Sequence, residues 1–471
     1  MKKPIPFMAA VFLAAAALSC DFPQSPDGGK GYLTVLMAAE APSGLYSKSS
    51  SILSGGSIAS FTYKLTFTGP GGIVEQTARG GSASVALDPG EWNIEAKAYD
   101  SSDRLVGTGN AAASIAAGQP NTVALKMYVD SAYAASLTDI YVHSETELRD
   151  YISLYDDPLG TVTFHLENDI TVNAPVEDLQ GSFDGHGHTI TLAISAADDT
   201  QFRVGLFRVN SGTIRNLRLE GSVTARNESV NGTLSVGAVA SLNSGTIMQV
   251  ASGVTVTVKA REPYFFMAGG IAGLNTGTIE DCSAGGDVTG EQILTALSGN
   301  PPAGGIAGTN RGTITRCYAW GKVFCGNIDG YIGGIAGENI SGGTISFCAA
   351  LNTSVSNDTG NPSPLHRITN NSGYSLNNNY AYEDMQVISS PVTGGVPGNE
   401  DGGDILVTIL QDPGSRTTFW NAPSPGLDWP ALQTTPPAGE GWYWGKTITI
   451  PSPGGFSPPV SPVYVPALWF E

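Results

Sequence analysis

Charged residues are scarce in this chain, and helical periodicity is nearly absent. Asp, Glu, Lys and Arg make up 14% of the 471 residues, against about 25% in an average soluble domain. The 23 Lys and Arg against 42 Asp and Glu leave a net charge of −19. Nucleic-acid phosphates require a basic surface, so this acidic chain predicts no nucleic-acid partner. The lack of a helical pattern excludes helical bundles and coiled coils.

Cysteines and long apolar runs are also few. The chain has only five cysteines, and no segment beyond residue 20 has the roughly 18 apolar residues that a spanning helix needs. The His-Glu-x-x-His sequence of zinc peptidases does not occur. We therefore expect no later membrane span, no cofactor and no metal site.

Glycine and small apolar residues are abundant instead. Glycine supplies 60 of the 471 residues, and 41% of the chain is hydrophobic. The chain can therefore bury a core, and its many turn residues favour an all-β fold.

The first twenty residues have the features of an export signal. Lys2 and Lys3 precede an apolar run over residues 4–18, and small residues lead to Cys20. This arrangement resembles a bacterial lipoprotein signal, which implies removal of residues 1–19 and acylation, with palmitate among the chains, at Cys20. Residues 20–30 would then be a tether. An ordinary secretory signal with an incidental cysteine is the alternative.

Residues 31–129 are predicted to form a β-sandwich. Tyr63, Leu65 and Phe67 alternate on one strand face, as do Trp92 and Ile94 after a turn. Such period-two patterns at intervals of about ten residues are typical of sandwiches. Residues 87–100 resemble immunoglobulin-like or transthyretin-like modules, which implies a stalk or spacer.

One amphipathic helix is predicted, over residues 144–155. Ser144 and Glu147 form a capping box. Apolar side chains follow at helical spacing: Leu148, Tyr151, Ile152 and Tyr155. We expect this helix to cap the first coil of a solenoid.

An internal repeat is the strongest signal in the chain. The pattern Asn-x-Gly-Thr-Ile starts at Asn210, Asn243, Asn275 and Asn310, and a fifth copy with two extra residues starts at Asn339. Its glycines lie at 212, 245, 277, 312 and 343, at spacings of 33, 32, 35 and 31 residues. Short strands joined by Asn/Gly corners, which tolerate positive φ, predict a parallel β-helix over residues 138–390.

One position of the repeat is predicted to face the interior in every coil, so that its side chains stack on one another as a ladder. Compact apolar residues lie five positions after each repeated glycine: Leu217, Val250, Cys282, Cys317 and Cys348. Side chains in a parallel ladder point the same way, so we expect free buried thiols rather than disulfides.

Gly-Gly-Ile-Ala-Gly followed by Asn-x-Gly-Thr-Ile-x-x-Cys resembles the GLUG repeat over residues 183–350. GLUG repeats occur in large bacterial surface proteins, including adhesins and the non-catalytic parts of immunoglobulin A-specific metallopeptidases. The resemblance implies a right-handed β-helix at the cell surface and no catalytic residue.

The length differences between copies gather in one place. They fall within residues 225–232, 258–267, 290–303 and 325–331, so loops should project from one side of the solenoid. We predict that partners bind these loops. The candidate residues are Arg261, Glu262, Tyr264, Phe265, Asn327, Asp329 and Tyr331.

Candidate catalytic or metal-binding groups are few. His186 and His188 with Asp184 could form a metal site, but the Gly-His-Gly run also fits a turn. Glu280 and Asp281 are neighbours, which as strand residues would point to opposite faces. No acidic ladder crosses the coils, so no catalytic residue is predicted.

Residues 391–471 are rich in proline and tryptophan. They contain 14 of the 29 prolines and Trp420, Trp429, Trp442, Trp444 and Trp469. We expect a C-terminal cap of irregular β structure. An aromatic platform for carbohydrate is the sharper alternative.

Together these features predict an exported, lipid-anchored protein of the bacterial cell envelope, at the outer membrane or cell surface. It would act without catalysis in adhesion or envelope interaction, binding an extracellular protein or glycan. The alternative is a β-helix polysaccharide lyase or glycosidase, or a glycan-binding module; a hydrolase would need carboxylates about 5–9.5 Å apart.

Overall fold

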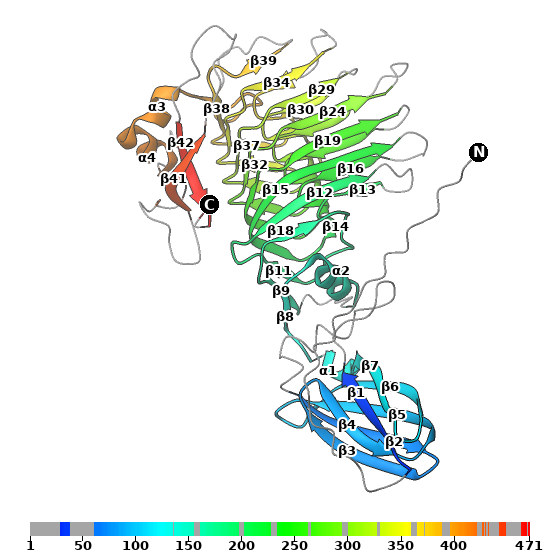
Figure 1. Cartoon of the computed structure of the whole chain (residues 1–471). Helices are drawn as coiled ribbons and strands as arrows, with labels where there is room; N and C mark the ends of the chain where they lie inside the picture. The colour runs from blue at the N-terminus through cyan, green and yellow to red at the C-terminus, as the bar shows by residue number, and fades with distance from the viewer. Residues whose placement is uncertain are drawn as a thin grey trace, which may run out of the picture. The chain divides into compact units, whose positions relative to one another are not determined.

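The chain forms two compact units in a computed structural model, with the boundary at residues 128–129 (Figure 1). The described residues are 29–37, 61–134, 136–154, 161–196, 202–227, 233–261, 265–293, 300–326, 330–358, 365–371, 373–388, 396–421, 426–427, 429, 432, 442–448, 463–468 and 470–471. None of the helices in these ranges is long and apolar enough to cross a membrane.

Seven strands make up the N-terminal unit, and they wrap around one core (Figure 1). They are β1 (Gly31–Met37), β2 (Thr62–Gly69), β3 (Gly72–Arg79), β4 (Ser82–Leu87), β5 (Gly90–Tyr99), β6 (Leu105–Ile115) and β7 (Pro120–Val129). Their order is β3-β2-β5-β6-β7-β1-β4. The predicted alternation is confirmed, because Tyr63, Leu65, Phe67, Trp92 and Ile94 are all buried.

The second unit begins with a short segment that precedes the coils. Its elements are α1 (Ser131–Ala134), β8 (Asp139–Val142), α2 (Glu145–Leu154) and β9 (Thr163–Leu166). The predicted helix is present, with Leu148, Tyr151 and Ile152 buried; Tyr155 lies outside the described residues. The Ser144 hydroxyl accepts a hydrogen bond from the backbone N–H of Glu147 at 3.2 Å. The Glu147 carboxylate accepts from the N–H of His143 instead of that of Ser144, so the cap reaches one residue further back.

The second unit is a parallel β-solenoid, as predicted from the repeat. Two of its walls are six-stranded sheets and the third is continuous over 21 strands. The first wall contains β13 (Arg203–Val204), β16 (Leu234–Gly237), β20 (Phe266–Gly269), β25 (Pro302–Gly304), β30 (Tyr331–Gly333) and β35 (Leu365–His366). The second contains β14 (Phe207–Asn210), β17 (Ala240–Asn243), β21 (Ala272–Asn275), β26 (Ala307–Asn310), β31 (Ala336–Asn339) and β36 (Asn370–Asn371).

The long third wall also joins the capping strands to the coils. Besides β8 and β9 it contains β10 (Ile170–Val172), β11 (Ser182–Asp184), β12 (Thr189–Ala196), β15 (Thr213–Asn227), β18 (Thr246–Ser252), β19 (Thr255–Ala260), β22 (Thr278–Glu280), β23 (Ser283–Ala284) and β24 (Val288–Gln292). It continues through β27 (Thr313–Thr315), β28 (Tyr318–Ala319), β29 (Val323–Gly326), β32 (Thr344–Ser346), β33 (Ala349–Ala350), β34 (Ser354–Asn357), β37 (Ser375–Asn377), β38 (Tyr380–Tyr382), β39 (Gln386–Val387) and β40 (Gly403–Ile405).

The repeated asparagine forms a buried ladder of side-chain amides. Each Nδ2 donates to the Oδ1 of the next coil at 2.8 Å, without interruption through Asn210, Asn243, Asn275, Asn310 and Asn339. All five side chains are fully buried. A second bond from Nδ2 reaches a threonine carbonyl of the next coil, for example Thr278 O at 3.1 Å from Asn243. The asparagine therefore locks adjacent coils in register.

This finding corrects the expectation that the repeated Asn and Gly take positive φ at corners. The positive φ angles lie at a different rank: Asn216, Gln249, Asp281, Arg316, Phe347 and Asn378, all between 48° and 56°. The asparagine is needed for its amide. The glycine of Asn-x-Gly is needed for space, because a Cβ on Gly245 or Gly277 would overlap a glycine carbonyl oxygen of the preceding coil.

The C-terminal segment covers both the last coil and one flank of the solenoid. β40 pairs with β38 of the last coil. The other elements, α3 (Val407–Gln411), α4 (Pro413–Asn421), β41 (Trp442–Ile448) and β42 (Val463–Leu468), lie along the side (Figure 1). Tyr318 of β28 donates its hydroxyl to the carbonyl of Pro466 at 2.5 Å. The segment is thus more than the terminal cap that its composition predicts.

We predict that Asn275→Asp will destabilise the solenoid more than Asn275→Ala. Alanine removes two ladder bonds and leaves polar neighbours unsatisfied, each at a cost of about 1–3 kcal/mol. Aspartate faces the Asn310 oxygen with a second acceptor and also buries a charge. Denaturant unfolding followed by circular dichroism measures both. Asn377→Ala, at an exposed position, is the control; equal midpoints for all three variants would show that the ladder does not stabilise the fold.

Candidate functional site

The solenoid corners differ in how much their length varies. The first wall joins the second through two residues in five coils, at 205–206, 238–239, 270–271, 305–306 and 334–335, and through three, 367–369, in the last. The third wall joins the first through longer and unequal connections: 228–233, 261–265, 293–301, 327–330 and 358–364. We call this the variable corner. The arrowheads of β19, β24 and β29 point toward it, away from α3 and α4 (Figure 1).

The loops at the variable corner are shorter than the sequence predicts. Strands continue to Asn227, Ala260, Gln292 and Gly326, so part of each predicted loop is coil wall. Val258, Ala260 and Phe266 are fully buried. Small and apolar residues alternate at the start of these predicted loops. The parallel pairing of β19 with β24 therefore continues as far as Ala260 and Gln292.

Three of the seven candidate binding residues are within the described part of the chain. Phe265 is 41% exposed, and Arg261 is exposed beside it with its N–H bonded to Asn227 O. Tyr331 is half-buried in β30. Glu262, Tyr264, Asn327 and Asp329 lie outside the described residues, as does the predicted lipidation residue Cys20.

The five residues of the predicted ladder stack inside the solenoid. Leu217 pairs with Val250 on consecutive coils, and Cys282, Cys317 and Cys348 occupy the same rank of the next three. All five are fully buried. The four cysteines in the described residues are free thiols. Burial raises the pKa of Cys282 and Cys348 well above its ordinary value and that of Cys325 to about 12.

The acidic pair at Glu280 and Asp281 is bound by one arginine. Asp281 has a φ of 51°, so it turns the corner instead of continuing the strand. Both carboxylates consequently reach Arg316, at 3.3 Å from Glu280 and 2.7 Å from Asp281. This corrects the expectation that the two side chains point to opposite faces. The hydrogen bonds that the Arg316 guanidinium donates to Asp281 raise the pKa of Arg316.

Tryptophans of the C-terminal segment are buried against this same corner. The indole N–H of Trp442 donates to Asp281 at 3.3 Å, and that of Trp429 donates to the Phe347 carbonyl at 2.9 Å. Trp420, Trp429 and Trp442 are at most 5% exposed. These three rings are core, which removes them from the predicted carbohydrate platform; the side chains of Trp444 and Trp469 lie outside the described residues.

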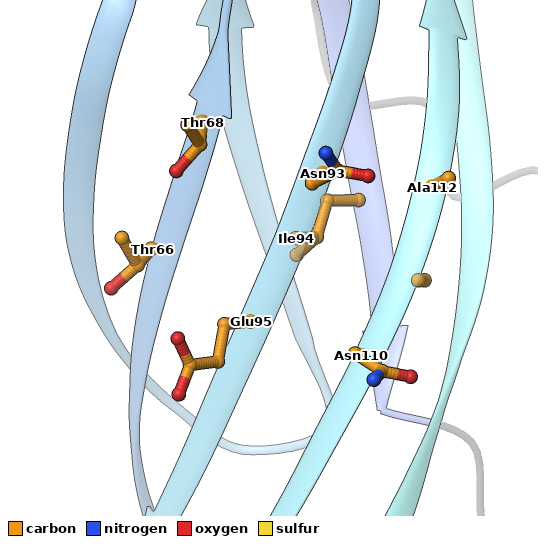
Figure 2. A pocket seen from close by; sticks show the side chains of 8 residues that line it. Thr66, Thr68, Asn93, Ile94, Glu95, Asn110 and Ala112 are labelled. Carbon is orange, nitrogen blue, oxygen red and sulfur yellow. The ribbon is translucent and has the colours of Figure 1, made fainter.

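The N-terminal unit has a shallow depression of about 530 Å³ on its outer sheet face. Thr66, Asn93, Glu95 and Asn110 project into it from three neighbouring strands (Figure 2). Its lining has one carboxylate and no aromatic ring. The depression therefore lacks the convergent groups of a catalytic or sugar-binding site.

A histidine cluster lies where the first coil meets the capping strands. His165 of β9 and His186 face each other, with Nδ1 and Nε2 3.1 Å apart. Asp184 is 3.8 Å from His186. Among the described residues these three form the group whose ligand atoms all lie within 4.8 Å. His188 is not part of it and pairs with Asp169.

Sequence reasoning found two of these three residues and missed His165. The sequence pairs His186 with His188 on one face, whereas β12 begins only at Thr189 and His186 takes a φ of 48° in a turn. The parallel register of β9 and β11 brings His165 beside Asp184. No repeat motif marks β9, so the sequence has no signal for this pairing.

Comparison with known protein families finds a match within the coils of the solenoid. The family model described as the GLUG motif matches residues 266–289. The chain carries the GLUG motif. The matched segment runs from the first residue of β20 to the second of β24, which is most of one coil. Its inward residues include Ala268, Ile271, Ile279 and Cys282, all buried.

The chain is also similar to a solved structure. It is the crystal structure of a "putative immunoglobulin A1 protease" from Bacteroides ovatus, with 22% sequence identity and a TM-score of 0.41. The match covers 57% of this chain and 85% of the other. The search of curated proteins found no match.

Buried residues of the matched segment build the coil. Phe266, Ile271, Asn275 and Ile279 are buried, and the Asn275 amide is used in the ladder. Thr276 and Asp287 of the same segment are exposed.

We predict that Cys317→Val will be nearly neutral and Cys317→Asp strongly destabilising. Valine of similar volume costs less than about 1.5 kcal/mol, whereas an unpaired buried carboxylate costs about 3 kcal/mol or more. Denaturant midpoints measure the difference. Native Cys317 should also resist a thiol reagent until the protein unfolds; equally fast reaction before and after unfolding would rule out the buried ladder.

Proposed function

We propose that this protein is an exported, lipid-anchored, non-catalytic surface protein that binds an extracellular protein or glycan through the variable corner. The observation that carries the proposal is the difference between corners. Two-residue corners are fixed by coil stacking, while the variable corner accepts connections of four to nine residues. Loops on a rigid scaffold are where recognition is usually located.

The chemistry of the variable corner suits contact with a partner. Phe265 offers an exposed aromatic face, and Arg261, which is also exposed, lies at the other end of the same connection. Aromatic residues and arginine are enriched where interfaces gain their binding energy. The opposite corner is covered by the C-terminal segment, which leaves this side for binding.

The proposal that the protein is non-catalytic is supported by three carboxylates of the coils that are held in ion pairs. Glu280 and Asp281 are bound by Arg316, and Glu291 pairs with Lys259 at 2.5 Å. A glycosidase needs a carboxyl group free to exchange a proton and a second one nearby. Ion-paired carboxylates do not meet that requirement.

The anchor is supported by the sequence of the first twenty residues. Lys2 and Lys3, the apolar run and Cys20 follow the order of a lipoprotein signal. Two acyl chains hold a protein on a membrane stably, whereas one chain does not. Cell-envelope localisation follows from this proposal.

We predict that a clickable fatty acid will label the protein in cells and that Cys20→Ser will abolish the label. No other cysteine is placed for acylation, since the four described ones are buried. In-gel fluorescence measures incorporation, with Cys325→Ser as the matched control that keeps the label. Equal labelling of wild type and Cys20→Ser would contradict the anchor.

We predict that Arg261→Ala combined with Phe265→Ser will reduce binding at least about tenfold without lowering stability. Loss of an arginine and an aromatic anchor costs about 2 kcal/mol or more in an interface. Beads coated with the full chain would be tested on a glycan array and on immobilised extracellular-matrix proteins. Thermal unfolding of the same variant checks the coil.

Tyr374→Ser is the matched control for this experiment, because Tyr374 is 39% exposed at a different corner of the solenoid. A second variant shortens residues 293–301 to four. Full binding after changes at both loops would move the site elsewhere. Cleavage of a polysaccharide by the wild type would favour the alternative, a carbohydrate-active enzyme.

A further inference from the structure

The histidine cluster at the first coil has the donor arrangement of a metal site. The Nε2 of His165 lies 2.8 Å from Asp139 Oδ1. In the tautomer that donates from Nε2 to Asp139, the lone pair of His165 Nδ1 faces His186. A carboxylate behind the imidazole is the usual support for a metal-ligating histidine.

The distances within the cluster fit a common cation. A zinc ion about 2.1 Å from each ligand permits ligand atoms to lie up to about 4.2 Å apart. His165 Nδ1 and His186 Nε2 are separated by 3.1 Å, and His186 Nε2 and Asp184 Oδ2 by 3.8 Å. The ligand atoms of all three residues lie within 4.8 Å of one another, so small side-chain adjustments bring them to the separations found around an ion. The His186 side chain, 39% exposed, has room for such an adjustment.

Asp184 is held in place for this role. Its Oδ1 accepts from the N–H of His186 at 3.0 Å and from Asn216 at 3.1 Å. Its Oδ2, which faces His186, also accepts from Arg215 at 2.9 Å. The side chain is 6% exposed. The carboxylate is therefore oriented before any ion arrives, and one lone pair of Oδ2 remains.

The charge of the surroundings favours a divalent cation. Glu167 lies 3.6 Å from the Nδ1 of His186, on the side away from His165. The carboxylates of Asp139, Asp184 and Glu167 outnumber the one guanidinium, that of Arg215, around the two imidazoles. The positive φ of His186 does not by itself support a metal site, because the following coils also have a residue with positive φ at the corresponding corner.

We propose that His165, His186 and Asp184 bind one zinc ion, with a fourth position open to solvent. Two imidazoles and a carboxylate form a zinc donor set, and three protein ligands with one open position are typical of zinc sites that accept a further ligand. The ion joins β9 of the capping strands to β11 and the following turn. This inference is independent of the variable corner, and it replaces the sequence-based expectation of no metal.

Zinc binding by the untagged, detergent-solubilised full chain tests the proposal. Competition with a chromophoric chelator should give one bound zinc per chain, and cobalt should give the visible absorption of a tetrahedral site. Zinc should raise the unfolding temperature, because an ion that binds only the folded state stabilises it.

Three variants and one control define the site. His186→Asn, which tolerates positive φ, and His165→Gln, which can still donate to Asp139, should each weaken zinc binding at least about 100-fold. Asp139→Asn should weaken it about 10- to 100-fold, as loss of an outer hydrogen-bond partner does. His188→Asn should leave it unchanged, because His188 pairs with Asp169 outside the cluster.

Circular dichroism of each variant verifies that the solenoid is intact. The proposal is overturned if the wild-type chain binds no zinc at micromolar free metal. It is equally overturned if His165→Gln and His186→Asn bind zinc as tightly as the wild type, since the ion would then be held by other groups.

Discussion

A continuous line of buried asparagine amides sets the register on which the rest of the solenoid depends. Each amide donates to the next coil and accepts from the previous one, at 2.8 Å throughout. A slip of one residue would leave a buried donor and acceptor unsatisfied in every coil, at a cost of about 1–3 kcal/mol for each group. Such a slip would also turn the inward apolar side chains of a strand outward, so the hydrophobic core and the amide ladder specify the same register.

That register has a steric consequence which divides the surface into fixed and free parts. Coils locked at this spacing bring backbones together at Gly269, Gly304 and Gly333, where a Cβ would overlap an alanine carbonyl or the next coil. Those walls and their two-residue corners cannot change without breaking the stack. Most of the length variation falls at the variable corner, where the chain leaves the third wall and returns to the first. The corner between the second and third walls varies less, with residues 340–343 in the fifth copy where the first four copies have two residues each. The proposed binding surface is thus a product of the same constraint that builds the core.

The sequence predicted those features that repeat, and it failed where the repeat stops. In-phase copies were enough to place Leu217, Val250, Cys282, Cys317 and Cys348 on one inward rank. The asparagine was also found, but its role was assigned to backbone conformation, because a sequence shows Asn beside Gly and does not show which amide faces which. His165 was missed because β9 has no counterpart in the repeat, and only its parallel pairing with β11 brings it to Asp184. The tryptophan-rich segment was identified, but not whether its rings face the core or the solvent. Composition alone does not distinguish a buried aromatic cluster from an exposed one.

At the two ends of the solenoid, where the asparagine ladder stops, ion pairs take its place. In a stacked array each coil contacts only its neighbours, so the terminal coils have a single stabilising partner. At the N-terminal end, the position paired with Asn210 is Leu179, which has no amide, and charged contacts appear instead, with Arg215 bound to Asp184. At the C-terminal end, buried Arg367 pairs with Asp404 at 2.7 Å and donates to the carbonyls of Asp401 and Gly402. Ionic groups suit these places because water still reaches one side of each pair and lowers the cost of burying charge. A metal ion at His165, Asp184 and His186 would extend the same solution, because it ties the first coil to its cap with bonds that stacking cannot supply.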